Sequence, residues 1–108
     1  MSEMCQLCIN ISSDIEEELM SHLWLIPDIV TGCTSIPAQG FGSRQHYRNI
    51  QEKIQGATER NLILLILPLE NVPLVLAHIQ IKFNSSDCFY WVIPTITSGY
   101  ASQGGVNE

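Results

Sequence analysis

The sequence predicts an α+β domain of the ferredoxin-like class, with the order strand, helix, strand, strand, helix, strand. Three observations predict it: apolar alternation of period two near the N-terminus, two helical segments that each follow a strand, and prolines placed where sheet edges tolerate them. With 108 residues, 45% of them hydrophobic, the chain suits one domain with its own core, and we treat residues 1–108 as a single unit.

The first strand and the first helix are predicted over residues 4–26. Apolar side chains alternate along one face of the strand at Cys5, Leu7, Ile9 and Ile11. Ser13 and Glu16 have the spacing of a capping box, and further acidic residues follow at the positive end of the helix. Apolar residues then recur at helical spacing until Pro27 ends the helix.

The remaining elements are two strands, a helix and a last strand. The second and third strands are predicted over residues 32–39 and 61–67, with a long loop over 41–57 between them. Ile50 and Ile54 have helical spacing, so we expect a helical turn within this loop. The second helix runs from Asn71 to about Phe83, the last strand covers 88–97, and residues 98–108 form a loose tail.

The prolines support one sheet order. Right-handed crossovers give an antiparallel sheet in the order 4-1-3-2. Proline cannot donate a hydrogen bond to a neighbouring strand and is confined to edges, first positions or bulges. Pro37 and Pro94 lie in the second and fourth strands, which this order places at the two edges, and the central strands have none.

The sheet has too few helices to cover both faces. The third and fourth strands are apolar on both faces, so one face would expose a large hydrophobic patch, which usually marks an interface. We therefore predict symmetric self-association, without a choice between dimer and trimer on physical grounds alone. The alternative is that the tail folds over this face. The predicted interface residues are Leu64, Ile66, Tyr90, Trp91 and Ile93.

The charge distribution narrows the classes of partner. A net charge of −6 argues against nucleic acid, which binds clustered cations. Arg44, Arg48, Lys53 and Arg60 nevertheless fall within one stretch, where we expect an anionic ligand or partner. The longest apolar run, over residues 62–69, is too short to span a membrane, and the N-terminus lacks the features of a signal peptide. We therefore expect a cytoplasmic protein.

A short motif at the end of the second strand resembles a known family. Residues 39–46, Gln-Gly-Phe-Gly-Ser-Arg-Gln-His, are similar to the Gly-Phe-Gly-Arg-Gln element that opens the long loop of the PII superfamily of trimeric signalling proteins. The chain is most similar to an uncharacterised PII-like family of proteobacteria, often encoded beside heavy-metal efflux pumps. The similarity covers most of the chain and includes Gly32, residues 51–56, Tyr90, Trp91, Pro94 and Gly99.

The resemblance implies a homotrimer with ligand sites in the clefts between subunits and a loop that docks on a target protein. The residues expected to contact the ligand or partner are Gln39, Gly40, Phe41, Gly42, Arg44, Gln45, His46 and Arg48. PII proteins also carry a glycine-rich, basic loop that holds phosphate between the second helix and the last strand. This chain has Asn-Ser-Ser-Asp at residues 84–87, which argues against ATP binding in the PII manner.

A transition metal is the other ligand class that we consider. Cys33, His46 and Cys88 are candidate soft ligands, if strand ends and the long loop of neighbouring subunits converge at a cleft. Each of them alone can equally be structural. Cys5 and Cys8 form a CxxC, but residues i and i+3 of a strand point to opposite faces, so one ion cannot take both thiols.

No nucleophile, base and orienting group stand together in the sequence, so we predict a protein that is not an enzyme. The leading interpretation is a trimeric regulator that senses a small ligand or a transition metal and acts through the 41–57 loop. One alternative is a divalent-metal binding or tolerance protein that carries the metal as cargo. Another is that the loop has no partner and only aids solubility.

Overall fold

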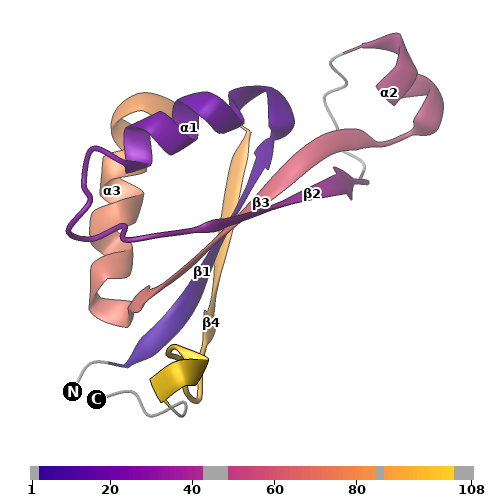
Figure 1. The fold of residues 1–108 in the computed structure, drawn as a ribbon. Coiled ribbons are helices and arrows are strands. Elements are labelled where there is room, and N and C mark those ends of the chain that lie inside the picture. The colour runs from indigo at the N-terminus through magenta and orange to yellow at the C-terminus, as the bar shows by residue number, and fades with distance from the viewer. Residues whose placement is uncertain (1–2, 43–48, 85–86, 104–108) are drawn as a thin grey trace.

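The fold is a four-stranded antiparallel sheet with two long helices on one side (Figure 1). It was obtained as a computed structural model, which describes residues 3–42, 49–84 and 87–103. In chain order, the elements are β1 (Met4–Ser12), α1 (Glu16–Leu23), β2 (Thr34–Gly40), α2 (Ile50–Gln55), β3 (Thr58–Pro68), α3 (Val72–Phe83) and β4 (Cys88–Pro94). Short 3-10 turns lie at Ser13–Ile15, Leu69–Asn71 and Ala101–Gln103.

The strand order confirms the predicted topology. The sheet runs β2-β3-β1-β4, which is the order 4-1-3-2 counted from the other edge. The prolines of β2 and β4, Pro37 and Pro94, therefore lie on edge strands, where a missing backbone donor costs least.

The core lies between the sheet and the pair formed by α1 and α3. All four alternating residues of β1, from Cys5 to Ile11, are at most 1% exposed on the helix side, which confirms their predicted face. Leu19 and Leu23 of α1 and Val75 of α3 pack against them and are fully buried. This layer fixes the positions of the segments that carry the candidate sites.

Several boundaries differ from the sequence prediction: α1 ends at Leu23, before the predicted stop at Pro27, and β2 covers Thr34–Gly40 in place of residues 32–39. β3 begins at Thr58, three residues earlier than expected, since its start pairs with Gly40 at the end of β2. β4 ends at Pro94, three residues earlier than expected, although the Thr95 amide still donates to the Met4 carbonyl of β1 at 3.2 Å. The loop between β2 and β3 contains the short helix α2, which confirms the predicted helical turn.

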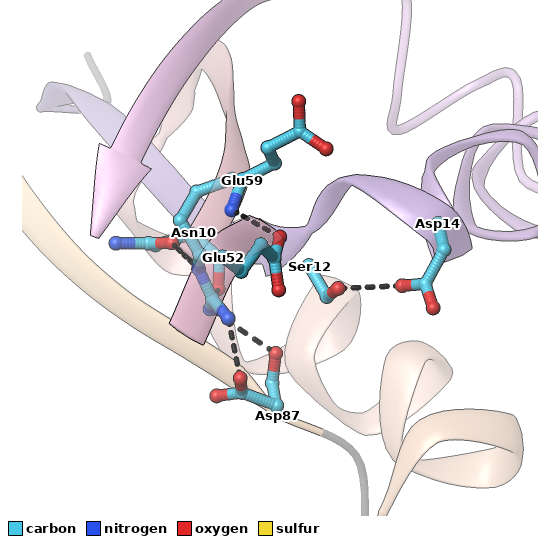
Figure 2. Close-up of polar contacts among 7 residues, drawn as sticks. Asn10, Ser12, Asp14, Glu52, Glu59 and Asp87 are labelled. Carbon is cyan, nitrogen blue, oxygen red and sulfur yellow. Dashed lines mark hydrogen bonds and ion pairs between the residues drawn. The ribbon is translucent and has the colours of Figure 1, made fainter. Parts of the chain in front are cut away.

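The predicted capping box is wrong. Neither Ser12, which precedes the 3-10 turn, nor Ile15, which precedes α1, accepts a capping hydrogen bond through its side chain. Instead the Ser12 hydroxyl donates to the Asp14 carboxylate (Figure 2). The 3-10 turn separates β1 from α1 and removes the helical N-terminus at which Ser13 would have acted.

Among the described residues, no helix is long and apolar enough to cross a membrane.

Candidate functional site

The face of the sheet away from the helices is apolar, as predicted. Across it, Leu64 of β3, Cys8 of β1 and Trp91 of β4 are direct neighbours in the pairing register. We call this surface the open face, and its apolar residues are Cys8, Ile36, Leu62, Leu64, Ile66, Phe89, Trp91 and Ile93. The register also places the polar residues Gln6, Asn10 and Thr34 on this face. Ile66 is 45% exposed and Phe89 is 64% exposed, so these apolar side chains lack a cover within the described residues.

Four of the five predicted interface residues lie on the open face. Leu64, Ile66, Trp91 and Ile93 share it, whereas Tyr90 pairs with Ile9 and therefore points to the helix side. Because β4 is apolar at every position, its sequence alone did not reveal which residues face which way. Tyr90 is consequently left out of the interface that we propose below.

A polar cluster around Arg60, with Asn10 and Asp87 as its partners, lies near the start of β3 (Figure 2). The guanidinium of Arg60 donates from Nε to the Asn10 side-chain oxygen at 2.8 Å and from one terminal nitrogen to the Asn10 carbonyl at 3.1 Å. It also forms an ion pair with the Asp87 carboxylate and donates to the Asp87 carbonyl at 3.3 Å. The cluster thus joins β1, β3 and the turn before β4.

Gly40 allows the loop to leave the sheet beside this cluster. It pairs with Thr58 in the last position of β2. A Cβ at Gly40 would lie 3.0 Å from Cγ of Arg60 and 3.0 Å from the Thr58 hydroxyl oxygen. Only glycine therefore fits against the buried stem of Arg60 without displacing it, which gives this residue of the predicted motif a structural role.

The other end of the loop is fastened by α2. The Asn49 side chain accepts a hydrogen bond from the Glu52 amide at 2.9 Å, which caps the helix, and Gly56 ends it in the left-handed conformation with φ of 70°. Glu52 is 2% exposed, and its carboxylate accepts from the Glu59 amide of β3 at 2.8 Å (Figure 2). Both ends of the loop are therefore tied to β3.

The predicted contact residues divide into two groups. Gln39 and Gly40 end β2, and Phe41 and Gly42 follow it, with the Phe41 side chain 68% exposed. The other predicted contacts, Arg44, Gln45, His46 and Arg48, lie outside the described residues.

The two described cysteines of the predicted metal set are far apart in one chain. Cys33 immediately precedes β2 and Cys88 begins β4, and these are the two edges of the sheet. Three strand spacings separate the edges, about 14 Å, whereas metal–sulfur bonds are near 2.3 Å. Cys5 and Cys8 lie on opposite faces of β1, as predicted. In the part of the chain that the structure describes, no three His, Cys, Asp or Glu side chains gather to hold a metal ion.

Cys33 has a different soft neighbour. Its thiol lies 3.7 Å from the thioether sulfur of Met20 on α1. Burial raises the pKa of the Cys33 thiol, and the nearby Glu16 carboxylate raises it further. Burial also raises the pKa of the Cys88 thiol, with an opposing effect of Arg60. Both thiols are therefore protonated at neutral pH unless a metal or another reagent displaces the proton.

A cavity of about 620 Å³ adjoins Cys33 at one end of the open face. Its lining combines the segment before β2, the open face and the chain after β4, and includes Cys33, Leu64, Ile66, Ser98 and Tyr100. None of its lining residues carries a charge. The chain after β4 thus returns toward this end of the open face. This is the direction that the tail would take if it covered the open face, as in the alternative to self-association.

Comparison with known proteins places the chain in a family. Residues 1–102 match the family DUF3240, described as a protein of unknown function. The chain belongs to the DUF3240 family. No curated protein matches it. A DUF3240 protein from Shewanella baltica OS155 has a similar structure, with a TM-score of 0.74 and 18% identity over 93% of this chain and 98% of that one.

Two further structures relate this DUF3240 chain to PII-like proteins. CPII, a nitrogen regulatory PII-like protein from Thiomonas intermedia K12 bound to ADP, AMP and bicarbonate, has a TM-score of 0.65 and 19% identity over 90% of this chain and 96% of its own. CutA from Synechococcus elongatus PCC7942, in complex with Bis-Tris, has a TM-score of 0.70 and 11% identity over 98% and 92%. The predicted PII-like fold is thereby confirmed.

The turn between α3 and β4 carries the Asp87 carboxylate, which pairs with Arg60. Its two described residues are Asn84 and Asp87, and the Asp87 carboxylate would repel a phosphate. The nearby guanidinium of Arg60 already donates hydrogen bonds to Asn10 and Asp87.

Sequence reasoning missed the partners of Arg60. Asn10 is a polar residue inside an otherwise apolar strand, and Asp87 was read only as part of a polar turn. An amide within an apolar strand is a useful signal, because a buried polar group needs a hydrogen-bond partner. The sequence offers no comparable signal for Asp87.

Proposed function

We propose that this chain is a homotrimeric, PII-like regulatory protein of the cytoplasm that acts through its 41–57 loop and is not an enzyme. The observation that carries the proposal is the open face. A PII-like sheet with Leu64, Trp91 and Ile93 on a face that no helix covers is suited to association with identical copies. Ile66, half exposed beside them, belongs to the same contact.

The loop supplies the surface for a target. Both of its ends are tied to β3, by the pairing of Gly40 with Thr58 at one end and by the Glu52 carboxylate at the other. The exposed Phe41 offers an apolar contact, and the sequence of the loop adds the basic residues Arg44 and Arg48 as cationic contacts. A protein with an acidic surface fits this combination better than nucleic acid does, given the net charge of −6.

The effector is a small ligand or a transition metal bound between subunits. The cavity beside Cys33 supports this proposal, because 620 Å³ lies within the range of ordinary ligand pockets and its rim includes open-face residues. Because its described lining is uncharged, a neutral ligand suits it better than a nucleotide.

Sedimentation velocity at micromolar concentration tests the assembly. We expect the wild type to sediment as three chains of 12.1 kDa, and Leu64→Asp, which places a charge in the open face, to sediment as one. Ile81→Asp is the matched control, because Ile81 is 77% exposed on α3, on the other side of the molecule. A monomeric wild type would refute the proposal.

Ligand titration tests the sensing function. Copper, zinc and silver ions and adenine nucleotides are added separately, and the melting temperature and the proteolysis of the 41–57 loop are measured. A ligand that binds the native state must stabilise it by mass action, so at least one addition should raise the melting temperature and change loop cleavage. Unchanged melting and cleavage with every addition would contradict sensing of these ligands.

A second candidate function is metal carriage, in which the ion is cargo. The contact between the Cys33 thiol and the Met20 thioether favours it, because sulfur donors select soft ions. In this form of the proposal Cys33, His46 and Cys88 meet across subunit boundaries. Triple substitution to Cys33→Ser, His46→Ala and Cys88→Ser should then lower the bound metal per trimer, and an unchanged metal content would exclude the carrier function.

A further inference from the structure

Two histidines on different helices form a reciprocal pair. The rings of His22 on α1 and His78 on α3 are stacked, with centroids 3.9 Å apart and planes within 6°. Nε2 of His22 lies 2.6 Å from the carbonyl oxygen of His78, and Nε2 of His78 lies 2.6 Å from the carbonyl oxygen of His22. Each ring therefore binds the backbone of the helix that carries the other ring.

The partners fix the tautomers of the two rings. A carbonyl oxygen only accepts, so each Nε2 must carry a hydrogen. In the neutral pair, both rings are thus Nε2–H tautomers, and both Nδ1 atoms keep a lone pair. This state makes both hydrogen bonds without any charge, and a proton added to Nδ1 leaves the Nε2–H donors in place.

The charges around the pair nearly cancel. One turn before His22 on α1 is Glu18, and one turn after His78 on α3 is Lys82, and these two side chains form an ion pair at 3.9 Å. Phe83 meets the His22 ring edge-on, with centroids 5.7 Å apart. Glu18, the carboxylate one turn before His22, already faces Lys82 and is not held against either ring.

In the described part of the sheet, the helix side carries one carboxylate, and it lies toward the loop end of the sheet. The titratable side chains on the helix side are Cys5, Cys88 and Tyr90, which are neutral when protonated, and Glu59 near the start of β3. Glu59 lies toward the loop end of the sheet, where its backbone amide bonds to Glu52 of α2. The remaining acids of α1, Glu16 and Glu17, belong to its first turn, and Glu16 bonds to Ser35.

We propose that the His22–His78 pair is a proton-sensitive clasp between α1 and α3. One added proton is compatible with the stacked arrangement, because one charged ring and one neutral ring can remain stacked. Two added protons place like charges on rings whose centroids are 3.9 Å apart. His22 is only 8% exposed, so water solvates its charged ring poorly. The doubly charged pair separates, and the contact between the two helices loosens.

This device is independent of the proposed signalling function. Imidazole changes its charge between pH 5 and 8, so the clasp responds to mild acidification. Unfolding or local opening lets both rings take up protons in water. The stability that the clasp contributes is therefore fully present at pH 8 and is lost as the pH falls, because the open state binds more protons than the closed state.

Paired glutamine substitutions separate the proton effect from the hydrogen bonds. The side-chain amide of glutamine can donate where histidine Nε2 does, but it does not titrate. Melting temperatures are measured at pH 7.5 and pH 5.0 for the wild type and for the double variant His22→Gln, His78→Gln. Between pH 7.5 and pH 5.0, the melting temperature of the wild type should fall by about 4–8 °C more than that of the double variant.

His46→Gln is the matched control, since His46 is the third histidine of the chain and lies outside the pair. The melting temperature of this control variant should fall on acidification by as much as that of the wild type. Equal losses in the wild type and the double variant would refute the clasp. If the double variant does not fold, nitrogen-15 NMR of the wild-type imidazoles decides: both Nε2 atoms must be protonated at pH 7.5, and rings protonated at Nδ1 alone would overturn the proposal.

Discussion

Replacement of Asp87 by asparagine tests whether the ion pair at the loop base stabilises the molecule. The side chain keeps its shape and one acceptor oxygen for Arg60, whereas the negative charge is lost and the second oxygen becomes an NH2 group. Arg60 is 7% exposed, whereas Asp87 is 54% exposed. The cost should lie between that of an exposed ion pair, at most about 1 kcal/mol, and that of a broken buried pair, about 3–5 kcal/mol. We expect a loss of about 2 kcal/mol.

Urea denaturation followed by circular dichroism measures this loss, and the melting temperature should fall by about 8 °C for a domain of this size. Glu17→Gln is the matched control, because it removes the same charge from an exposed position on α1 and should change stability by less than about 0.5 kcal/mol. Combining Asp87→Asn with Arg60→Met completes a double-mutant cycle with a coupling energy of about 2 kcal/mol. Equal midpoints for Asp87→Asn and Glu17→Gln would refute the reasoning.

Three further predictions concern the loop and Cys33. Gly40→Ala should cost about 1–2 kcal/mol in urea denaturation, because the new methyl group meets Arg60 at 3.0 Å; an unchanged midpoint would mean that Arg60 moves freely. Asn49→Ala removes the cap of α2 and should cost about 1 kcal/mol and speed proteolysis between residues 49 and 57, and unaltered cleavage would contradict the cap. Cys33 has a raised pKa, so its alkylation should be slow at pH 7.5 and accelerate above pH 9; Glu16→Gln should lower the pKa and speed the reaction at pH 7.5, and a rate independent of pH would contradict the shift.

The fold was predictable because its signals are local. Alternation along β1 shows the buried face directly, and Pro37 and Pro94 identify the edge strands without reference to any contact. β4 is different, because a strand with apolar side chains at every position has no internal sign of register. Tyr90 was assigned to the wrong side of the sheet for that reason, and only its pairing with Ile9 reveals the side it faces.

The candidate sites were predictable only in part, since they join distant segments. Arg60 bonds to Asn10, 50 residues earlier, and to Asp87, 27 residues later. His22 and His78 are separated by 56 residues and meet because α1 and α3 pack side by side. Such contacts depend on the relative placement of whole elements, and the sequence pattern of one element does not contain that information.

The register of β3 connects the proposed interface with the proposed signalling loop. Leu64 and Arg60 point to the same side of this strand, four residues apart, which is about 13 Å. A ligand of ordinary size that binds between subunits at Leu64 therefore lies close to the Arg60 cluster. If the ligand shifts β3, it also moves Thr58, the residue of β3 that pairs with Gly40 at the start of the loop. Asn10 and Asp87 hold Arg60 from two other segments, so a shift of β3 at Arg60 would also change these bonds. In a working trimer, the Asp87→Asn variant should therefore alter how ligand binding affects cleavage of the 41–57 loop while leaving ligand affinity unchanged, and equal effects on both would contradict this route.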